Sequence, residues 1–386
     1  MVKGEIMKRL FAILFVMLFT VTNACAADFS SDAALRKELE ALKERVAMLE
    51  AKLAQQDRSI EKQADEVKEV KSRISYERGE GITVEPAGLN IGAGATFVTQ
   101  MALDPNVAGG DNQVTDATYS IDVEIEKEFD DWGLAFIHLE GGEGGGLDGD
   151  EIATFSGVNR DAGDSGSHVD ITEVWYEHYF LDGRLALVGG KLDPTVMLDH
   201  NEIANDECSQ FLAAAFRNST VVEFPDDNTY GFRALVKPMD WMELEGGIFD
   251  DDADWEDIFS DMFSYTQINF KPTLFGHDGN YRAYFWLDDA KHTKWADPGT
   301  TTQVNLGFGT SCDQRVTDYL TLFGRFGWQD PDVSVVEWAW STGFQLDGTV
   351  WGRENDYLGF AVGMDIPGGD YGDAGNPDDP EGHLEA

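Results

Sequence analysis

The chain has 386 residues, a formal net charge of -44 and a mean hydropathy of -0.31. Such an acidic chain repels the phosphates of nucleic acids, so we expect no polynucleotide ligand. After the N-terminal region no apolar run approaches about 18 residues, which excludes a bundle of membrane-spanning helices but not a membrane β-barrel. The 12% of aromatic residues and the 41 Gly are typical of a β-protein with many turns.

Residues 1–26 have the three parts of a secretory signal. Lys8 and Arg9 precede an apolar run from Leu10 to Val21, and the small residues Ala24-Cys25-Ala26 follow. We therefore expect export and cleavage near the end of this segment. Two alternatives stay open, a retained N-terminal anchor and a lipid attached to the cysteine.

Residues 27–80 are predicted to form a coiled-coil segment. From about residue 33 to 75, apolar positions recur at alternating steps of four and three, charged residues fill the flanks, and neither Gly nor Pro interrupts the repeat. The pattern predicts a homo-oligomer, with a trimer favoured over a dimer, and a single amphipathic helix lying on the protein's own surface is the alternative. Two glutamines are expected to form polar layers within the apolar seam. The residues that we expect to carry the association are Leu39, Leu42, Val46, Leu49, Leu53, Gln56, Ile60 and Gln63.

Residues 81–386 are predicted to form an all-β, antiparallel transmembrane barrel. Short segments alternate apolar and polar residues between clusters of Gly, Asp, Asn and Pro, most clearly from Tyr119 to Phe129. A soluble sandwich also shows one apolar and one polar face, but recurrent charge on the polar face favours a barrel with a wet interior. We expect short turns at 130–131 and 181–183 and long external loops at 140–168 and 250–262. The length suits roughly 14 or 15 strands, and bacterial barrels need an even number, so we expect C-terminal strands to be missing.

The stretch from Gly190 to Ser219 reads GKLDPTVMLDHNEIANDECSQFLAAAFRNS and resembles the carbohydrate-selective porin family typified by OprB. A second match is Gly352-Arg353-Glu354-Asn355-Asp356 with Leu358-Gly359, and the resemblance covers about residues 82 to 386. It implies a barrel of about 16 strands in the outer membrane that passes sugars, often glucose, by facilitated diffusion. Family members continue beyond Ala386, and an N-terminal coiled coil is not general among them.

The acidic segment inside this stretch is the predicted constriction of the channel. Carboxylates and guanidinium groups hydrogen-bond to sugar hydroxyls, and passive transport needs such contacts to be weak enough to release the solute. The alternative is that Asp206 and Glu207 only cap or tether a loop helix at 205–216, and both can hold. The candidates, acidic and polar residues first and the opposing arginines after them, are Asp199, Asn201, Asn205, Asp206, Glu207, Arg217, Arg233, Arg282, Arg325 and Arg353.

Other motifs indicate neither a catalytic site nor a cofactor. The glycine run 141–146 lacks the Lys-Ser/Thr of a phosphate-binding loop. Asp250, Asp252 and Asp254 imitate the start of a calcium loop, but Trp255 occupies the position that needs Gly. The histidines show no metal-ligand spacing, so we expect no metal centre. After cleavage of the signal Cys208 and Cys312 would remain, and their pairing stays open.

The sequence thus predicts an outer-membrane porin for small solutes, and carbohydrates such as glucose are the favoured solutes. We expect a polar acidic lumen, with outer-membrane lipid around the barrel. A general cation-preferring porin is one alternative. The other is a structural tether in which the coiled coil reaches from the outer membrane to peptidoglycan. An enzyme is disfavoured because no catalytic group of residues can be named.

Overall fold

The computed structural model describes residues 82–84, 89–103, 113–147, 152–161, 168–257, 259–302, 304–353 and 356–386. These belong to the second of two compact units, Val70–Ala386. The predicted signal and the predicted coiled coil from Leu39 to Gln63 lie outside the described residues.

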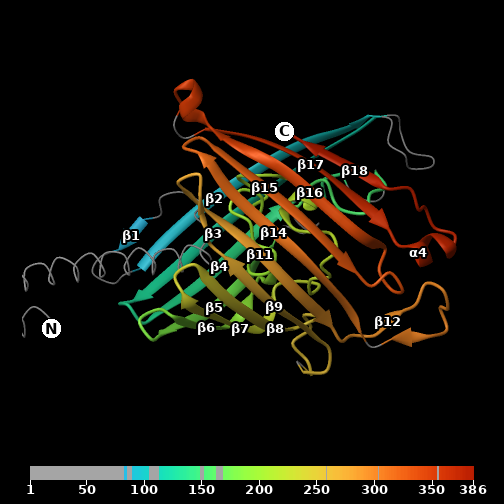
Figure 1. Cartoon of the computed structure of the whole chain (residues 1–386), viewed down its shortest axis with the longest axis horizontal. Helices are drawn as coiled ribbons and strands as arrows, with labels where there is room; N and C mark the ends of the chain where they lie inside the picture. Colours follow the sequence, from blue (N-terminus) through green and yellow to red (C-terminus); the bar gives the residue numbers. More distant parts are fainter. Residues whose placement is uncertain are drawn as a thin grey trace, which may run out of the picture. The chain divides into compact units, whose positions relative to one another are not determined.

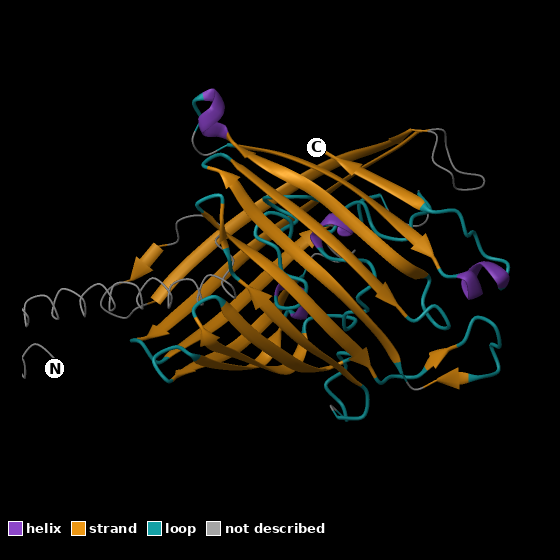
Figure 2. Ribbon diagram, viewed as in Figure 1, coloured by secondary structure: helices purple, strands orange, loops and turns teal. Residues whose placement is uncertain are grey.

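One antiparallel sheet forms the wall of a barrel, and each strand pairs with its neighbours along the chain (Figures 1 and 2). The path of paired strands runs from β1 to β9, continues through β11 and β14 and ends at β18, with β10 paired to β11 at its side. β12 and β13 form a separate two-stranded hairpin. The predicted antiparallel barrel fold is therefore confirmed.

The strands have the following bounds: β1 Ile82–Val84, β2 Leu89–Leu103, β3 Gln113–Phe129, β4 Gly133–Glu143, β5 Val169–Phe180, β6 Leu185–Leu192, β7 Thr229–Met239, β8 Met242–Asp250, β9 Met262–Phe270, β10 Thr273–Leu274, β11 His277–Asp288, β12 His292–Thr293, β13 Thr301–Thr302, β14 Asn305–Thr317, β15 Leu320–Gln329, β16 Val336–Asp347, β17 Tyr357–Pro367 and β18 Glu381–Glu385. The short helices are η1 Pro194–Val196, α3 Ala214–Arg217, η2 Gly348–Trp351 and α4 Gly369–Asp373. None of these helices of the described residues is long and apolar enough to cross a membrane.

Side chains alternate between the two faces of the wall, as the sequence pattern predicts. In β15, Leu322 and Phe326 are 43% and 46% exposed on the outer face, whereas Phe323 and Arg325 are 3% and 4% exposed on the inner face. Successive side chains of a strand point to opposite faces, so this alternation places apolar groups on the outer face, while the inner face carries both the apolar Phe323 and the charged Arg325.

Short turns join the strands at one end of the barrel and long connections join them at the other. The turn between β5 and β6 is closed by Leu181, Asp182 and Gly183 in left-handed conformations, with φ of 56°, 57° and 82°. The predicted long loop at 250–262 is found between β8 and β9. The loop predicted at 140–168 is shorter than expected, because β4 extends to Glu143. The longest connection, residues 193–228 between β6 and β7, is called the lumenal loop below.

Part of the interior is apolar, beside the polar and charged side chains that also face inward. Inward aromatic residues of β4, β5, β8, β9 and β11 pack with Val196, Met197 and Leu198 of the lumenal loop into one buried apolar cluster. Within it the rings of Phe263 and Trp286 stack at 5.9 Å between centroids. This cluster fixes the first part of the lumenal loop against the wall, since apolar area removed from water contributes about 25 cal/mol per Å².

A charge on the outer face should prevent stable insertion. Phe326 lies in the middle of β15 between Thr310 and Trp340 of the neighbouring strands. Phe326→Arg is expected to destabilise the folded barrel by about 2–4 kcal/mol, because a guanidinium near the middle of the bilayer is poorly solvated. Unfolding in urea from lipid vesicles measures this loss. Tyr319→Arg, at the short turn before β15, is the matched control and should change the stability by less than about 1 kcal/mol; equal losses at both positions would contradict the membrane-facing assignment.

Candidate functional site

The lumenal loop crosses the inside of the barrel and contacts strands far apart in the sequence. Its Asn201 amide donates to Ser311 Oγ of β14 at 3.1 Å, and Trp286 of β11 donates to the Val221 carbonyl at 3.1 Å. Its Thr220 hydroxyl donates to Asp365 of β17 at 2.5 Å. The segment predicted to form the constriction thus lies inside the barrel and contacts its wall at several strands.

Arg325 of β15 is the centre of this arrangement. Its Nε lies 2.8 Å from Asp199 Oδ2, and both side chains are almost completely buried. Its Nη1 donates to the Phe216 carbonyl at 2.8 Å, and its Nη2 donates to the Arg217 carbonyl at 3.1 Å and to the carbonyl of Ala204. One guanidinium thus joins the beginning and the end of the lumenal loop, because it satisfies carbonyls that would otherwise be buried without a partner.

The predicted residues Asn201 and Asn205 also hold the shape of the loop. The Asn205 side chain accepts from the Asn201 N–H at 3.1 Å and donates to the Thr195 carbonyl at 3.2 Å. Asp199, Asn201 and Asn205 are only 0%, 1% and 6% exposed. These three side chains therefore have little access to solvent, and their polar atoms bond within the loop and to the wall.

Arg217 joins η1 to the segment after it. Its Nη1 donates to Thr195 Oγ1 at 2.5 Å, its Nη2 lies 3.4 Å from Asp193 Oδ2, and its Nε bonds to Glu207. The tethering role predicted for Glu207 as an alternative is therefore present. Asp206 accepts from the N–H groups of residues 208 and 209 at 2.9 and 2.7 Å, which closes a turn. The helix expected at 205–216 is reduced to the four residues of α3.

The lumenal loop also contacts the loop before β5. Cys208 Sγ donates to Asp161 Oδ1 at 3.0 Å, and Ser120 of β3 donates to the same carboxylate at 2.9 Å. Burial raises the pKa of Asp161, although the bonds from Cys208 and Ser120 act in the opposite direction. Cys208 and Cys312 are both free thiols.

Two predicted arginines lie on the wall and are paired there. Arg233 Nη2 donates to Glu245 at 2.7 Å and its Nη1 lies 3.5 Å from Glu177. Arg282 Nη1 donates to Asp313 at 2.5 Å. Because each guanidinium faces carboxylates, the lumen presents donors and acceptors side by side with little net positive charge.

Arg353 is not brought to this site. It lies in the connection after η2, at the end of the barrel with the short turns, where its side chain is 72% exposed and pairs with Asp356 at 2.6 Å. The other nine candidate residues named from the sequence all lie in the lumenal loop or on the inner face of the wall.

Glu202 is a further candidate that the sequence reasoning missed. Its side chain is 51% exposed, and Oε1 lies 3.7 Å from Arg282 Nη2 and accepts from the Asn280 amide at 3.4 Å. It is the exposed carboxylate beside buried Asn201, and it reaches solvent where Asp199, Asn201 and Asn205 do not. Its position in the acidic stretch did not separate it from its neighbours.

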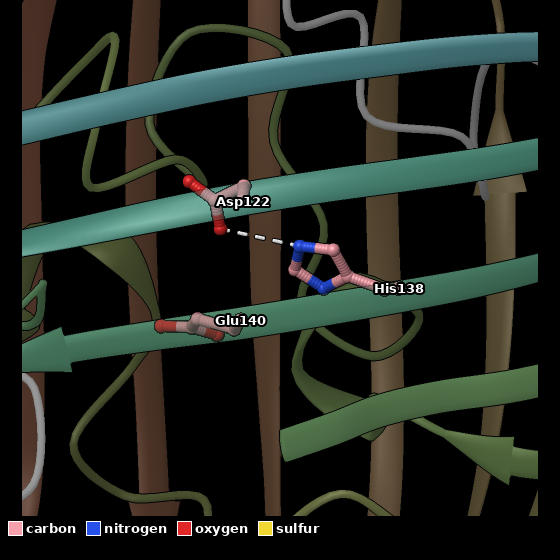
Figure 3. Close-up of side chains that lie close together, drawn as sticks. All are labelled: Asp122, His138 and Glu140. Carbon is pink, nitrogen blue, oxygen red and sulfur yellow. Dashed lines mark hydrogen bonds and ion pairs between the residues drawn. The ribbon is translucent and has the colours of Figure 1, made fainter. Parts of the chain in front are cut away.

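Two groups combine a histidine with carboxylates from different segments. On the wall, His138 Nε2 lies 3.2 Å from Asp122 Oδ1, with Glu140 beside them (Figure 3). Thr172 Oγ1 lies 2.8 Å from the other ring nitrogen, Nδ1. At the long-loop end, His292 lies between Asp288, four residues earlier in the chain, and Glu223 of the lumenal loop. Residue spacing did not reveal either group, because one member of each comes from a segment that only the fold brings close.

Comparison with known families agrees with this architecture. The model of the carbohydrate-selective porin, OprB family, matches residues 110–386. No curated protein matches the chain.

A solved structure shows the same fold at low sequence identity. The high-pH structure of OprB from Pseudomonas putida has a TM-score of 0.62 and 17% identity, over 75% of this chain and 77% of that one. The outer-membrane channel DcaP of Acinetobacter baumannii has a TM-score of 0.42 and 12% identity, over 75% of this chain and 82% of that one.

Removal of the central guanidinium should loosen the lumenal loop. Arg325→Leu leaves the buried Asp199 carboxylate with the Ser219 N–H but without its opposing charge, and it removes donors from several buried carbonyls. A loss of about 3–5 kcal/mol in unfolding free energy is therefore expected. Thermal unfolding in detergent measures the loss, and single-channel recording should show larger or noisier conductance. Arg353→Gln, an exposed arginine outside the site, should leave both unchanged. Unaltered conductance in a folded Arg325→Leu barrel would contradict the role given to Arg325.

Proposed function

Because the chain belongs to the carbohydrate-selective porin family, OprB, and is an outer-membrane porin, we propose that it lets small carbohydrates such as glucose cross by facilitated diffusion. The observation that carries the proposal is the lumenal loop, a polar segment held across the barrel by buried arginines. No step of such transport needs a catalytic group.

The pairing of charges in the lumen favours a neutral polyhydroxylated solute. Arg282 with Asp313, and Arg217 with Asp193 and Glu207, place guanidinium donors directly beside carboxylate acceptors. These pairs are buried and their charges neutralise one another, so a solute meets little uncompensated charge from them. A sugar hydroxyl both donates and accepts, so it can bond to groups that stay exposed beside the pairs, such as Glu202. An ion of either sign is attracted by one member and repelled by the other.

A general porin with cation preference is the second candidate. Asp122, Glu140 and Glu173 stand on the inner face of β3, β4 and β5, and the whole chain carries a formal net charge of -44. Rings and clusters of carboxylates attract cations into a pore. The two candidates differ in what they predict for uncharged solutes.

Liposome swelling separates them. Proteoliposomes that contain the full chain should swell faster in glucose than in a zwitterion of matched size, because a zwitterion has fewer groups able to both donate and accept. Equal rates would refute sugar selectivity. Reversal potentials in planar bilayers then measure the cation preference, and a clear anion preference would contradict the acidic lumen of both candidates.

Glu202 should contribute to both properties. Glu202→Gln keeps the size and the acceptor oxygen but removes one exposed negative charge beside Arg282. We expect a smaller cation preference and an altered rate of glucose entry, within about tenfold, since one exposed charge contributes about 1 kcal/mol or less. Asp318→Asn is the control, because that carboxylate is 92% exposed at a short turn. If the Glu202 variant and the control have the same selectivity, Glu202 does not lie on the path of the solute.

A further inference from the structure

Three side chains from separate segments converge at the long-loop end of the barrel. Glu223 comes from the last part of the lumenal loop, Asp288 is the final residue of β11, and His292 begins the hairpin of β12 and β13. His292 Nε2 lies 3.1 Å from Asp288 Oδ2 and 3.2 Å from Glu223 Oε2. One ligand atom of each residue lies within 4.8 Å of the others.

A contact from outside the group orients the imidazole. His292 Nδ1 lies 3.0 Å from the Ala290 carbonyl oxygen. A carbonyl can only accept, so Nδ1 carries the hydrogen and Nε2 is left to face the two carboxylates. A histidine that binds a metal is typically held in this way, with its second nitrogen donating to a carbonyl or carboxylate. The two carboxylates are held as well, since Asn305 donates to Glu223 and Asp288 accepts from the Ala290 N–H at 2.8 Å.

The distances between these side-chain atoms suit one metal ion bound at the centre of the group. Two atoms that are each about 2.1 Å from a metal ion lie about 3.0 Å apart at octahedral angles and about 3.4 Å apart at tetrahedral angles. The two measured separations from Nε2, 3.1 and 3.2 Å, fall between these values. Without a metal, a proton on Nε2 is needed to hold an imidazole against two carboxylate oxygens at this distance.

Negative charge is in excess around the imidazole. The Asp226 N–H donates to the Asp251 carbonyl at 3.1 Å, which brings two more acidic residues to the group. Burial, with the carboxylates of Asp288, Glu223 and Asp226, raises the pKa of Asp251 to about 7. A dication would therefore relieve more repulsion here than the single charge of an imidazolium does.

We propose that Glu223, Asp288 and His292 bind a divalent transition-metal ion of the Zn²⁺ type. One imidazole and two carboxylates are a ligand set for Zn²⁺, whereas Mg²⁺ prefers oxygen ligands alone. Binding displaces the proton from Nε2, so one proton leaves for each ion bound. Glu223 is 44% exposed, which gives the ion a path from solvent, while Asp288 is 2% exposed.

A bound ion would fasten the lumenal loop to the mouth of the barrel. The three ligands belong to the loop, to the wall and to the hairpin, so the ion adds a link to those that already join these elements, such as the Arg325–Asp199 ion pair. The proposal does not depend on which solute the channel carries.

The other two groups of potential ligands are weaker. His138 has Asp122 at one nitrogen and Thr172 at the other, and its group lies on the wall of the lumen (Figure 3). Asp250, Asp252 and Asp254 form a purely acidic cluster with two exposed members. The His292 group alone among these three combines an imidazole oriented by a carbonyl with open access.

Zn²⁺ titration of the full chain in detergent tests the proposal. Excess Mg²⁺ is kept present to occupy the diffuse acidic surface. One Zn²⁺ per chain should bind above this background, with release of one proton, and Co²⁺ in its place should give visible absorption bands from a site with a nitrogen ligand. His292→Gln and Glu223→Gln should each weaken this event about tenfold or more. Zn²⁺ should also raise the unfolding temperature of the unaltered chain but not of the variants.

Asp297→Asn is the matched control, because Asp297 is an exposed acid in the same hairpin and only caps its turn. It should bind Zn²⁺ as the unaltered chain does. Heat-modifiable migration in gels shows whether each variant is folded, and Glu223→Gln keeps the test valid if His292→Gln fails to fold. Identical titrations for the unaltered chain and Glu223→Gln would overturn the proposal and leave an imidazolium clamped between two carboxylates.

Discussion

The buried guanidinium of Arg325 is the interaction on which the pore depends. A loop inside a barrel brings its own carbonyls and N–H groups into a space where water is restricted, and each buried group needs a partner. Arg325 donates to the carbonyls of Ala204, Phe216 and Arg217, in two separate parts of the lumenal loop, and faces the Asp199 carboxylate. Hydrogen bonds to charged groups contribute about 1.5–3 kcal/mol each, so they offset part of the entropy lost when the loop is ordered, and burial of apolar side chains must offset the rest.

Two kinds of anchor hold that loop. Val196 to Leu198 near its start and Val222 near its end pack into the apolar cluster of the wall, a contact that is strong but not directional. The middle and end are held by directional bonds, such as those of Asn201 to Ser311 and Thr220 to Asp365. The apolar cluster therefore fixes the loop in place, and the polar bonds set the path that a solute meets.

The wall of the barrel was predictable from sequence, whereas the contacts inside it were largely not. Alternation in segments such as 119–129 specifies which side chain faces in, because the period of a strand is two and a slip would expose the wrong face. The family motif also placed Asp199, Asn201 and Arg217 inside. It did not distinguish buried Asp199 from exposed Glu202, since burial depends on Arg325, which is more than a hundred residues away in the chain. Arg353 has the charge expected of a pore residue, but its place after η2 puts it at the short-turn end.

Pairing of charges rather than their number decides what the lumen offers to a solute. The large negative charge of the chain suggests an acidic pore. Buried arginines, however, form ion pairs with Glu177, Glu245 and Asp313 and neutralise their charges. A buried carboxylate that is already bonded has little remaining effect on an ion at a distance, because its partner cancels the field. Selectivity must then come from groups that keep solvent contact, such as Glu202 at 51% exposure beside Arg282. A rigid loop matters for the same reason: only if the Arg325 bonds hold the backbone still can one exposed carboxylate meet every solute in the same geometry.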